Sequence, residues 1–389
     1  MLSCGEPSGD LYAGALLREL RALDPSIHAR GLGGPEFAAA GGELIADYRG
    51  LSVTGLTEAI GKLPQSFGTM RRLVDSARRD PPDALVAIDF PDFNFRLARR
   101  IKRFGIPVVY YISPQLWAWR GGRLKTMRQI ADLVLVIFPF EESIYRDAGI
   151  PVAFVGHPLV DLAPPSEKGA FLRRHGLSVE ATTVAILPGS RPNEVKRILP
   201  DLTVAAERIR ARIPSVQFVV ARAPNLDDAL FEVLRSRQLD RLVIVENDTD
   251  AALSTADVAL VASGTATVQA SIHDTPMVIV YRVSPLTYRV LRRLVTVDTI
   301  GMVNLIAGEK IVPELIQEDF TPEAVAAQAI SLLTDDARRA RVHEGLARVR
   351  ERLGGSGASR RAAEAILQLV AGSRPLPASG FQLQARNEE

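Results

Sequence analysis

The stretch LVAIDFPDFN, residues 85–94, is an apolar run that leads into two carboxylates, Asp89 and Asp92. Two later apolar runs lead into small-residue turns, LPGSR at 187–191 and ASGTAT at 262–267. A buried strand that ends in acid offers a base, and one that ends in Gly, Ser and Arg offers a cradle for an anion. The pattern predicts transfer of a group carried on a phosphate donor, with acceptor and donor sites in different halves of the chain.

Apolar runs alternate with amphipathic helical stretches, which predicts α/β layering with parallel sheets. We expect two successive sets of strands, near 29–32, 84–89, 107–112, 132–137 and 152–155, then near 183–187, 216–220, 241–245, 257–261 and 277–281. Helices are expected between them, among them Leu11–Leu23, Phe95–Arg103, Glu194–Arg212, Thr265–Ile272 and Pro322–Leu333. Two such sets predict two doubly wound, Rossmann-like domains.

The link between the domains is expected at DLAPPSEK, residues 161–168, because its consecutive prolines disfavour regular structure. This predicts an N-terminal domain over 1–163 and a C-terminal domain over 164–340, with helices near 340–370 able to pack back on the first. Residues 372–389 are rich in Pro, Ser, Gly and polar groups, and we expect them to form a loose tail.

Composition narrows the class of protein. The 389 residues are 47% hydrophobic and 24% charged, as in folded globular proteins, and the net charge of +2 implies no nucleic-acid partner. Cys4 is the only cysteine, so an internal disulfide is impossible and a reducing compartment is expected. No apolar stretch reaches the ~20 residues that span a bilayer, and we see no secretory signal. The histidines are scattered without metal-site spacing, so we expect no metal centre.

The turn GEPSGD, residues 5–10, lies between a short apolar run and the first expected helix. Either the first strand is unusually short or the true start lies upstream. Glycines let the backbone approach a ligand, and free amides at a helix start attract anions, so Ser8, Gly9 and Asp10 are candidates on the acceptor side. The alternative is a strand-to-helix turn capped by Ser8 or Asp10.

The two carboxylates at 85–94 have distinct expected roles. In open parallel sheets, ligands bind beyond the carboxyl ends of the strands, where a carboxylate can take a proton from an attacking hydroxyl. We expect Asp89 to act as the base and Asp92 to cap the next helix on the acceptor side, although these roles can be exchanged or both can be caps. His157, in GHP at 156–158, is expected to reach the cleft between the domains or to form a hydrogen bond at the domain joint.

Two turns in the second half are candidates for a diphosphate site. The LPGSR turn combines backbone amides with an arginine that can hold two phosphate oxygens, and the ASGTAT turn offers amides without a charge. Neither fits the P-loop or the dinucleotide pattern, which disfavours ATP hydrolysis and NAD chemistry. The candidate contacts are Gly189, Ser190, Arg191, Ser263, Gly264, Thr265, Ala266 and, in the helix that follows, Gln269.

Two segments of the first half combine apolar side chains with cations. The segment 53–74 carries an apolar face beside Arg71 and Arg72, which suits an anionic membrane surface or an acyl chain; the alternative is an ordinary amphipathic helix with a long loop. SPQLWAWR, residues 113–120, holds both tryptophans. Trp117 is expected to stack on a sugar, to lie at a membrane interface, or to pack its own loop.

These motifs, taken in order, resemble those of the lipid-A-disaccharide synthase family, which are bacterial glycosyltransferases of the GT-B type. The resemblance covers the chain from Gly5 to about Leu369 and implies two Rossmann-like domains facing a cleft. It is carried by GEPSGD, AIDFPDFN, YISPQLWAWR, FPFEESIY, VGHP, LPGSRPNEV, ASGTATVQA and VNLIAG.

The resemblance also implies a reaction. The family transfers a diacylated glucosamine from UDP-2,3-diacylglucosamine to the 6-hydroxyl of lipid X, which is 2,3-diacylglucosamine 1-phosphate, and gives lipid A disaccharide 1-phosphate and UDP. Inversion at the sugar suits one in-line displacement with one base. By resemblance Asp89 is the base, and the 189–191 and 262–267 turns, with Asn304, face the nucleotide. No metal or cofactor is implied.

Because both substrates are lipids, the resemblance implies a cytoplasmic enzyme that associates peripherally with the inner membrane through the segment 53–74; a homodimer is left open. Two residues depart from the family pattern. Pro7 stands where a small residue is frequent, and Gln269 stands where a glutamate is usual. An amide lacks charge assistance, so we expect weaker UDP binding, which Gln269→Glu should restore. Competing interpretations are another UDP-sugar GT-B enzyme, a sugar epimerase, or a non-catalytic binding protein.

Overall fold

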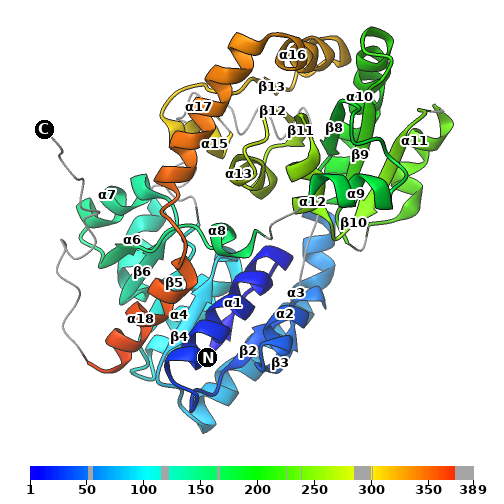
Figure 1. The fold of residues 1–389 in the computed structure, drawn as a ribbon. Coiled ribbons are helices and arrows are strands. Elements are labelled where there is room, and N and C mark those ends of the chain that lie inside the picture. The colour runs from blue at the N-terminus through cyan, green and yellow to red at the C-terminus, as the bar shows by residue number, and fades with distance from the viewer. Residues whose placement is uncertain are drawn as a thin grey trace, which may run out of the picture. The chain divides into compact units, whose positions relative to one another are not determined.

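The computed structural model describes residues 1–50, 56–114, 122–163, 167–224, 226–237, 239–283, 299 and 301–372, with residues 50 and 56–64 described in their backbone alone. The chain forms two compact units (Figure 1). The first contains Met1–Asp161 and Leu353–Glu389, and the second contains Leu162–Arg352. Residues 164–166 of the expected link, and the expected tail beyond residue 372, lie outside the described residues.

The first unit is built on a parallel sheet of seven strands in the order β3-β2-β1-β4-β5-β6-β7. Its order reverses between β1 and β4, so GEPSGD and DFPDFN follow the two strands of the switch point, where open α/β sheets bind ligands. The strands are β1 (Leu2–Ser3), β2 (Arg30–Gly33), β3 (Glu43–Asp47), β4 (Leu85–Ile88), β5 (Val108–Tyr111), β6 (Leu133–Val136) and β7 (Val152–Phe154).

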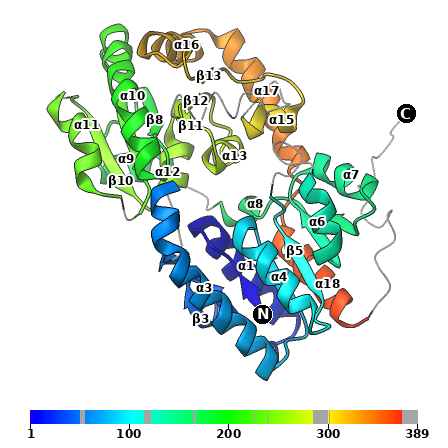
Figure 2. The same cartoon turned by 180° about the vertical axis from the view of Figure 1, so that it is seen from behind.

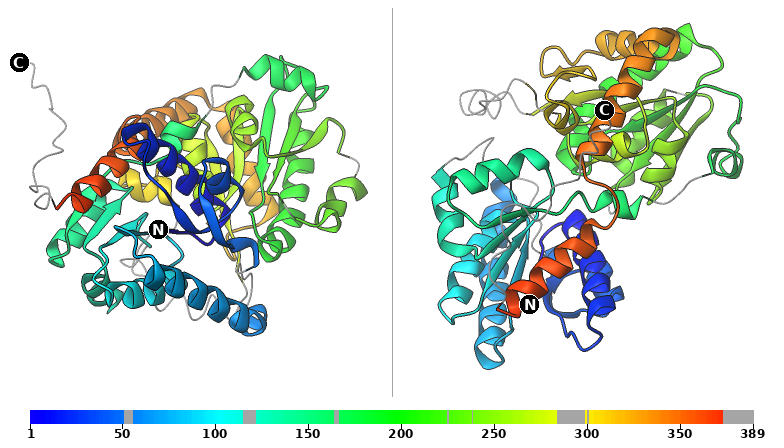
Figure 3. Two further views of the ribbon diagram at one scale, coloured as in Figure 1. Left: turned by 90° about the horizontal axis from the view of Figure 1, so that it is seen from below. Right: turned by 60° about the vertical axis from the view of Figure 1, so that its left-hand side comes forward.

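Helices cover both faces of this sheet. Helices α1 (Pro7–Leu23) and α18 (Ala358–Val370) pack together on one face, and α3 (Leu56–Arg79) and α4 (Pro91–Lys102) pack together on the other (Figures 1 and 2). Figure 3 shows α18, in red, alongside α1, in blue. The other helical segments among the described residues of this unit are α2 (Pro35–Ala39), η1 (Tyr48–Gly50), α6 (Gly122–Ile130), α7 (Pro139–Asp147) and α8 (Leu159–Leu162).

The second unit repeats the plan with six parallel strands in the order β10-β9-β8-β11-β12-β13. Its switch point lies between β8 and β11, the strands that lead into LPGSR and ASGTAT. The strands are β8 (Thr183–Leu187), β9 (Gln217–Arg222), β10 (Leu242–Glu246), β11 (Val258–Ala262), β12 (Met277–Tyr281) and β13 (Glu314–Ile316). The helical segments are α9 (Lys168–Arg174), α10 (Pro192–Arg212), η2 (Asp228–Phe231), α11 (Glu232–Ser236), α12 (Thr249–Thr255), α13 (Thr265–Ile272), α15 (Met302–Ala307), α16 (Pro322–Thr334) and α17 (Asp336–Arg352).

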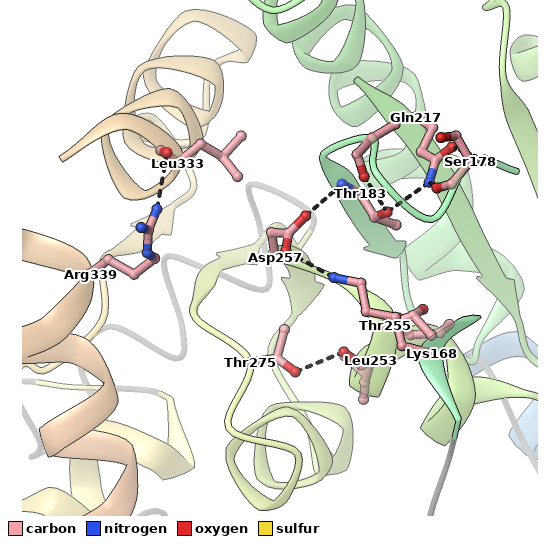
Figure 4. A network of polar contacts seen from close by, with 12 residues as sticks. Lys168, Ser178, Thr183, Gln217, Leu253, Thr255, Asp257, Thr275, Leu333 and Arg339 are labelled. Atoms are coloured by element: carbon pink, nitrogen blue, oxygen red, sulfur yellow. Dashed lines mark hydrogen bonds and ion pairs between the residues drawn. The ribbon is translucent and has the colours of Figure 1, made fainter. Parts of the chain in front are cut away.

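A network of hydrogen bonds joins residues at the amino ends of the strands of the second sheet (Figure 4). The Asp257 carboxylate accepts hydrogen bonds from Lys168 Nζ at 3.1 Å and from the Thr183 amide at 2.8 Å. Gln217 Nε2 donates to Thr183 Oγ1 at 2.9 Å and to the Ser178 carbonyl at 2.7 Å. These contacts align the first residues of neighbouring strands and leave the opposite, carboxyl edge to the candidate ligand turns.

Helix α17 differs in placement from the expectation that helices near 340–370 pack back on the first domain. It packs against α13, α15 and α16, so residues 340–352 belong to the second unit. Only α18 returns to the first, where Asp161 caps it by accepting from the Gly357 and Ser359 amides at 2.5 and 3.2 Å. In the part of the chain that the structure describes, no helix is both long and apolar enough to cross a membrane.

Candidate active site

A strained turn follows β4 at the switch point of the first unit. Asp89 and Phe90 have φ angles of 43° and 50°, in the left-handed region that aspartate tolerates and a bulky aromatic rarely adopts. Such strain persists only where the surroundings fix it, and it concentrates at functional sites. Asp89 itself is half-buried.

Asn94, which is fully buried in α4, fixes this turn. Its Nδ2 donates to the carbonyl oxygens of Asp89 at 2.8 Å, Ser3 at 3.1 Å and Ile88 at 3.2 Å, while its Oδ1 accepts from Ser3 Oγ at 2.6 Å. Tyr110 Oη donates to the same Asp89 carbonyl at 2.7 Å. One amide therefore joins the ends of β1 and β4 and holds the backbone of the candidate base.

Buried phenols stand close to this carboxylate. Burial raises the pKa of Tyr110, with the charge of Asp89 as the next cause. Burial also raises the pKa of Tyr12, with smaller effects from Tyr111 and Asp89. Both hydroxyls stay protonated at neutral pH, so neither can act as a base and Asp89 remains the candidate for that role.

The GEPSGD turn leads into a helix as expected, but neither Ser8 nor Asp10 caps that helix. Helix α1 begins at Pro7, a favoured first position, so Glu6 is the N-cap and Ser8 and Gly9 lie in the first helical turn. Asp10 does not cap α1 and is only 2% exposed. Its carboxylate accepts from the backbone amides of Gly34 at 2.7 Å, Glu36 at 2.9 Å and Phe37 at 3.1 Å, and so anchors the start of α2.

Gly5 is needed where the two turns meet. A Cβ on Gly5 would lie 2.2 Å from atoms of the Phe90 ring. We expect Gly5→Ala to displace Phe90, release the strained 89–90 backbone and lower the unfolding free energy by about 1–3 kcal/mol, as overpacking does. Denaturant unfolding of the purified variant measures this. A Cβ on Gly355 meets nothing within 4 Å, so Gly355→Ala is the control; equal stability of the two variants would contradict the prediction.

Asp92 and His157 occupy clearly different surroundings. Asp92 is exposed in the first turn of α4 and pairs with Arg123 at 2.9 Å; Phe90 is the N-cap of that helix, so Asp92 is not its cap. His157 is buried, accepts from the Leu159 amide through Nδ1 at 3.2 Å, and packs against Tyr12 and Phe138. Burial lowers its pKa to about 3, so the ring stays neutral, and all of these contacts lie within the first unit.

Part of the expected lipid-side surface lies on α3. Phe67 is 57% exposed, and Arg71 and Arg72 are exposed near it on the same helix. Arg71 forms a long ion pair with Asp75, at 3.6 Å. Trp117, the other candidate on this side, lies outside the described residues.

In the second unit, the carboxylate of Glu194 binds to the LPGSR turn. Glu194 Oε2 accepts from the Ser190 and Arg191 amides at 3.2 and 3.3 Å, and its Oε1 pairs with Arg191 Nη1 at 3.3 Å. Gly189, with φ of 118°, gives this carboxylate room, because a Cβ there would lie 2.8 Å from it. The sequence predicts that these amides are open to a phosphate, but Glu194 accepts hydrogen bonds from both of them, as in a capping box. The Arg191 side chain remains 49% exposed.

The ASGTAT turn leads into α13, Thr265–Ile272, which is the helix that the sequence predicts. Gly264 is the N-cap of α13, and Thr265 and Ala266 are its first residues, whose amides have no intrahelical partner. Ser263 is half-buried, and Gly264 and Thr265 are exposed. This helix start can therefore accept an anion, as helix N-termini do.

Asn304 has a structural role in this structure. It is 1% exposed, its Nδ2 donates to Val312 O at 2.9 Å and Glu314 Oε1 at 2.7 Å, and its Oδ1 accepts from the Ile311 and Val312 amides at 2.9 and 3.1 Å. All four of its hydrogen-bonding positions are used. The side chain expected to face the nucleotide instead holds the loop before β13.

Three residues of the site were missed from sequence. Asn94 carried a signal, since it is a polar residue between Phe93 and Phe95 on the buried face of α4. Tyr281, at the end of β12, lies near the LPGSR turn; burial and then Glu194 raise its pKa, while Arg191 lowers it. Asp250 contacts Gln269 and gave no signal. No group of three or more His, Cys, Asp or Glu side chains among the described residues could hold a metal ion.

Two parallel-sheet α/β units, each with its turns at the switch point, define a fold of the GT-B glycosyltransferase type. Solved structures agree: the glycosyltransferase of kitacinnamycin has a TM-score of 0.65 at 18% identity, covering 95% of this chain and 98% of that one. The UDP-GlcNAc 2-epimerase of Neisseria meningitidis has a TM-score of 0.66 at 13% identity, covering 94% and 98%. At these identities the likeness shows the fold alone.

Sequence comparison identifies the family within this fold. The family model for lipid-A-disaccharide synthetase matches residues 1–369. The lipid-A-disaccharide synthase of Myxococcus xanthus is 42% identical over 371 residues, 95% of this chain and 97% of that protein. That of Geobacter metallireducens is 40% identical over 378 residues, 96% and 98%. The chain belongs to the lipid-A-disaccharide synthase family of glycosyltransferases.

Proposed function

We propose that this protein transfers a diacylated glucosamine from UDP-2,3-diacylglucosamine to the 6-hydroxyl of lipid X, forming lipid A disaccharide 1-phosphate and UDP. The observation that carries the proposal is the Asp89 turn, a strained backbone braced by Asn94 and Tyr110 at a switch point. A protein that only bound its ligands would need no base at an acceptor hydroxyl. The name of the family, lipid-A-disaccharide synthetase, supports the product of this reaction.

In the proposed reaction, Asp89 takes the proton of the acceptor 6-hydroxyl as that oxygen attacks C1 of the donor sugar. The bond between C1 and the β-phosphate oxygen breaks, the electron pair leaves with UDP, and the configuration at C1 inverts. Arg191 and the first amides of α13 offset the charge that develops on the departing diphosphate. To reach the Ser190 and Arg191 amides as well, the diphosphate must displace Glu194.

The test is to incubate the purified protein with both lipids in mixed micelles and to follow the disaccharide 1-phosphate by mass spectrometry and UDP release by coupled assay. We expect both products in equal amounts. UDP release without lipid X would favour a hydrolase or an epimerase, and the absence of any product from both this chain and an N-terminally extended form would favour a binding protein.

We also propose that the protein works at the cytoplasmic face of the inner membrane, as a peripheral protein. The exposed Phe67, Arg71 and Arg72 of α3 combine an apolar side chain with cations, the pattern that binds anionic bilayers. This placement would bring a protein with lipid substrates to the surface where those lipids reside.

The double variant Arg71→Gln/Arg72→Gln is expected to weaken binding to anionic vesicles about 5- to 30-fold, from about 1 kcal/mol per cation near the surface. Sedimentation with vesicles of phosphatidylglycerol and phosphatidylethanolamine measures the effect. The control is Arg173→Gln/Arg174→Gln, a matched exposed pair on α9. Equal losses in the two double variants would mean that total charge, and not this helix, binds the membrane.

A further inference from the structure

A carboxylate, an amide and an imidazole come together beside the ASGTAT turn, within the second unit. Asp250 Oδ1, on α12, lies 3.4 Å from Gln269 Nε2 and 2.8 Å from His273 Nε2, both on α13. Asp250 is 28% exposed and the His273 side chain 9%. The position of α12 is fixed separately, because Thr275 Oγ1 donates to the Leu253 carbonyl at 2.8 Å (Figure 4).

The arrangement fixes which way the Gln269 amide faces. A carboxylate only accepts hydrogen bonds, so both nitrogens that face Asp250 must donate. An unrestrained glutamine side chain can exchange its oxygen and nitrogen by rotation, but Asp250 holds the nitrogen. The oxygen, Oε1, is therefore directed away from Asp250. Among the described residues the structure gives Oε1 no hydrogen-bond partner.

Gln269 shares a face of α13 with the turn that offers amides to an anion. Thr265, Ala266 and Gln269 are accessible, whereas Thr267, Val268, Ala270 and Ser271 are buried. Residues four apart lie on one side of a helix, about 6 Å apart along its axis. A ligand whose diphosphate binds at the helix start would place its ribose about one turn further along, beside Gln269. The ribose hydroxyls are donors, and an outward amide oxygen is the acceptor they need.

We propose that Asp250 is a positioning residue for nucleotide recognition: it fixes the Gln269 amide so that Oε1 accepts a hydrogen bond from a ribose hydroxyl of the UDP moiety. This proposal rests on the proposed function, because it requires a uridine nucleotide at the ASGTAT turn. His273 completes the cluster by donating to Asp250 and holding that carboxylate in place.

The experiment compares binding of UDP and 2′,3′-dideoxy-UDP by calorimetry. We expect the wild type to prefer UDP about tenfold, as one hydrogen bond provides. Asp250→Asn lets the amide turn round and should bring the preference below about threefold, as should Gln269→Ala. The matched control is Asp274→Asn, since Asp274 is an aspartate just beyond the same helix that pairs with His343 at 2.9 Å and with Arg350 at 2.6 Å. Asp274→Asn should keep the full preference for UDP over 2′,3′-dideoxy-UDP, although it should lower the thermal stability about as much as Asp250→Asn does.

Two further variants, which exchange the carboxylate and the amide of this pair, distinguish a positioning role of Asp250 from a role in folding. Sequence alone predicts tighter UDP binding in Gln269→Glu, but Asp250 changes that expectation, because two carboxylates would then face each other. Gln269→Glu should weaken UDP binding, and Asp250→Asn/Gln269→Glu should restore it. An unchanged preference in folded Asp250→Asn, or tighter binding in Gln269→Glu alone, would overturn the inference. A wild type that binds neither nucleotide would instead refute the proposed function and the inference with it.

Discussion

Replacing Asp89 by asparagine is expected to lower kcat for disaccharide formation by about 10²–10⁴-fold, the range that a general base contributes. Asparagine has nearly the shape of aspartate and leaves the main-chain contacts of the turn in place, since Asn94 and Tyr110 bind the Asp89 carbonyl and not its side chain. The loss should therefore appear in the chemical step. UDP affinity should remain within about twofold, because the nucleotide contacts belong to the other unit.

Single-turnover kinetics with both lipid substrates, together with UDP calorimetry, measures the two quantities. Asp92→Asn is the matched control, because Asp92 is the neighbouring carboxylate but is exposed and paired with Arg123. We expect that variant to keep its rate within about threefold. If Asp92→Asn lost the rate and Asp89→Asn kept it, the two roles would be exchanged; if both variants kept it, the base would have to come from another residue.

Much of the fold followed from the sequence because buried parallel strands are continuous apolar runs. The runs that became β4, β5, β6, β8 and β11 were all found. Strands β3 and β13 were missed, and both lie at the edge of a sheet. β3 exposes Glu43 and Leu44 to solvent, so it lacks the apolar run of a central strand.

The site was predictable where function depends on chain position, and less so where it depends on side-chain partners. Asp89 and the ASGTAT turn lie at switch points because the strand order places them there. The periodicity of the sequence could not show that Glu194 accepts hydrogen bonds from two amides of LPGSR. It also could not show that all hydrogen-bonding positions of Asn304 are satisfied by neighbouring residues of the fold. Nor could it show that Asp10 anchors α2. A polar side chain can bind a ligand or the backbone, and only the fold decides between them.

Asn94→Ala is expected to have the second large effect, a loss of about 2–5 kcal/mol in the free energy of unfolding. The carbonyls of Ser3 and Ile88 lose a donor and the Ser3 hydroxyl loses its acceptor, and each buried polar group left unpaired costs about 1–3 kcal/mol. Activity should fall as well, by about 10- to 100-fold in kcat, because the strained 89–90 backbone loses the side chain that holds it. Denaturant unfolding and single-turnover rates measured at a temperature where the variant is folded give the two quantities.

Ser3→Ala and a double variant show whether Asn94 acts on the reaction through Asp89. Ser3→Ala removes the contact to Asn94 Oδ1 but leaves both donors to the Asp89 carbonyl, so it should cost about 1 kcal/mol of stability and leave kcat within about threefold. If Asn94 positions the base, adding Asn94→Ala to Asp89→Asn should lower kcat little further, because the group being positioned is already absent. If the two losses in kcat multiplied in the double variant, the positioning role of Asn94 would be contradicted, and Asn94 would support the rate by another route. The reason is that two residues that act as one unit share one catalytic contribution, which can be lost only once.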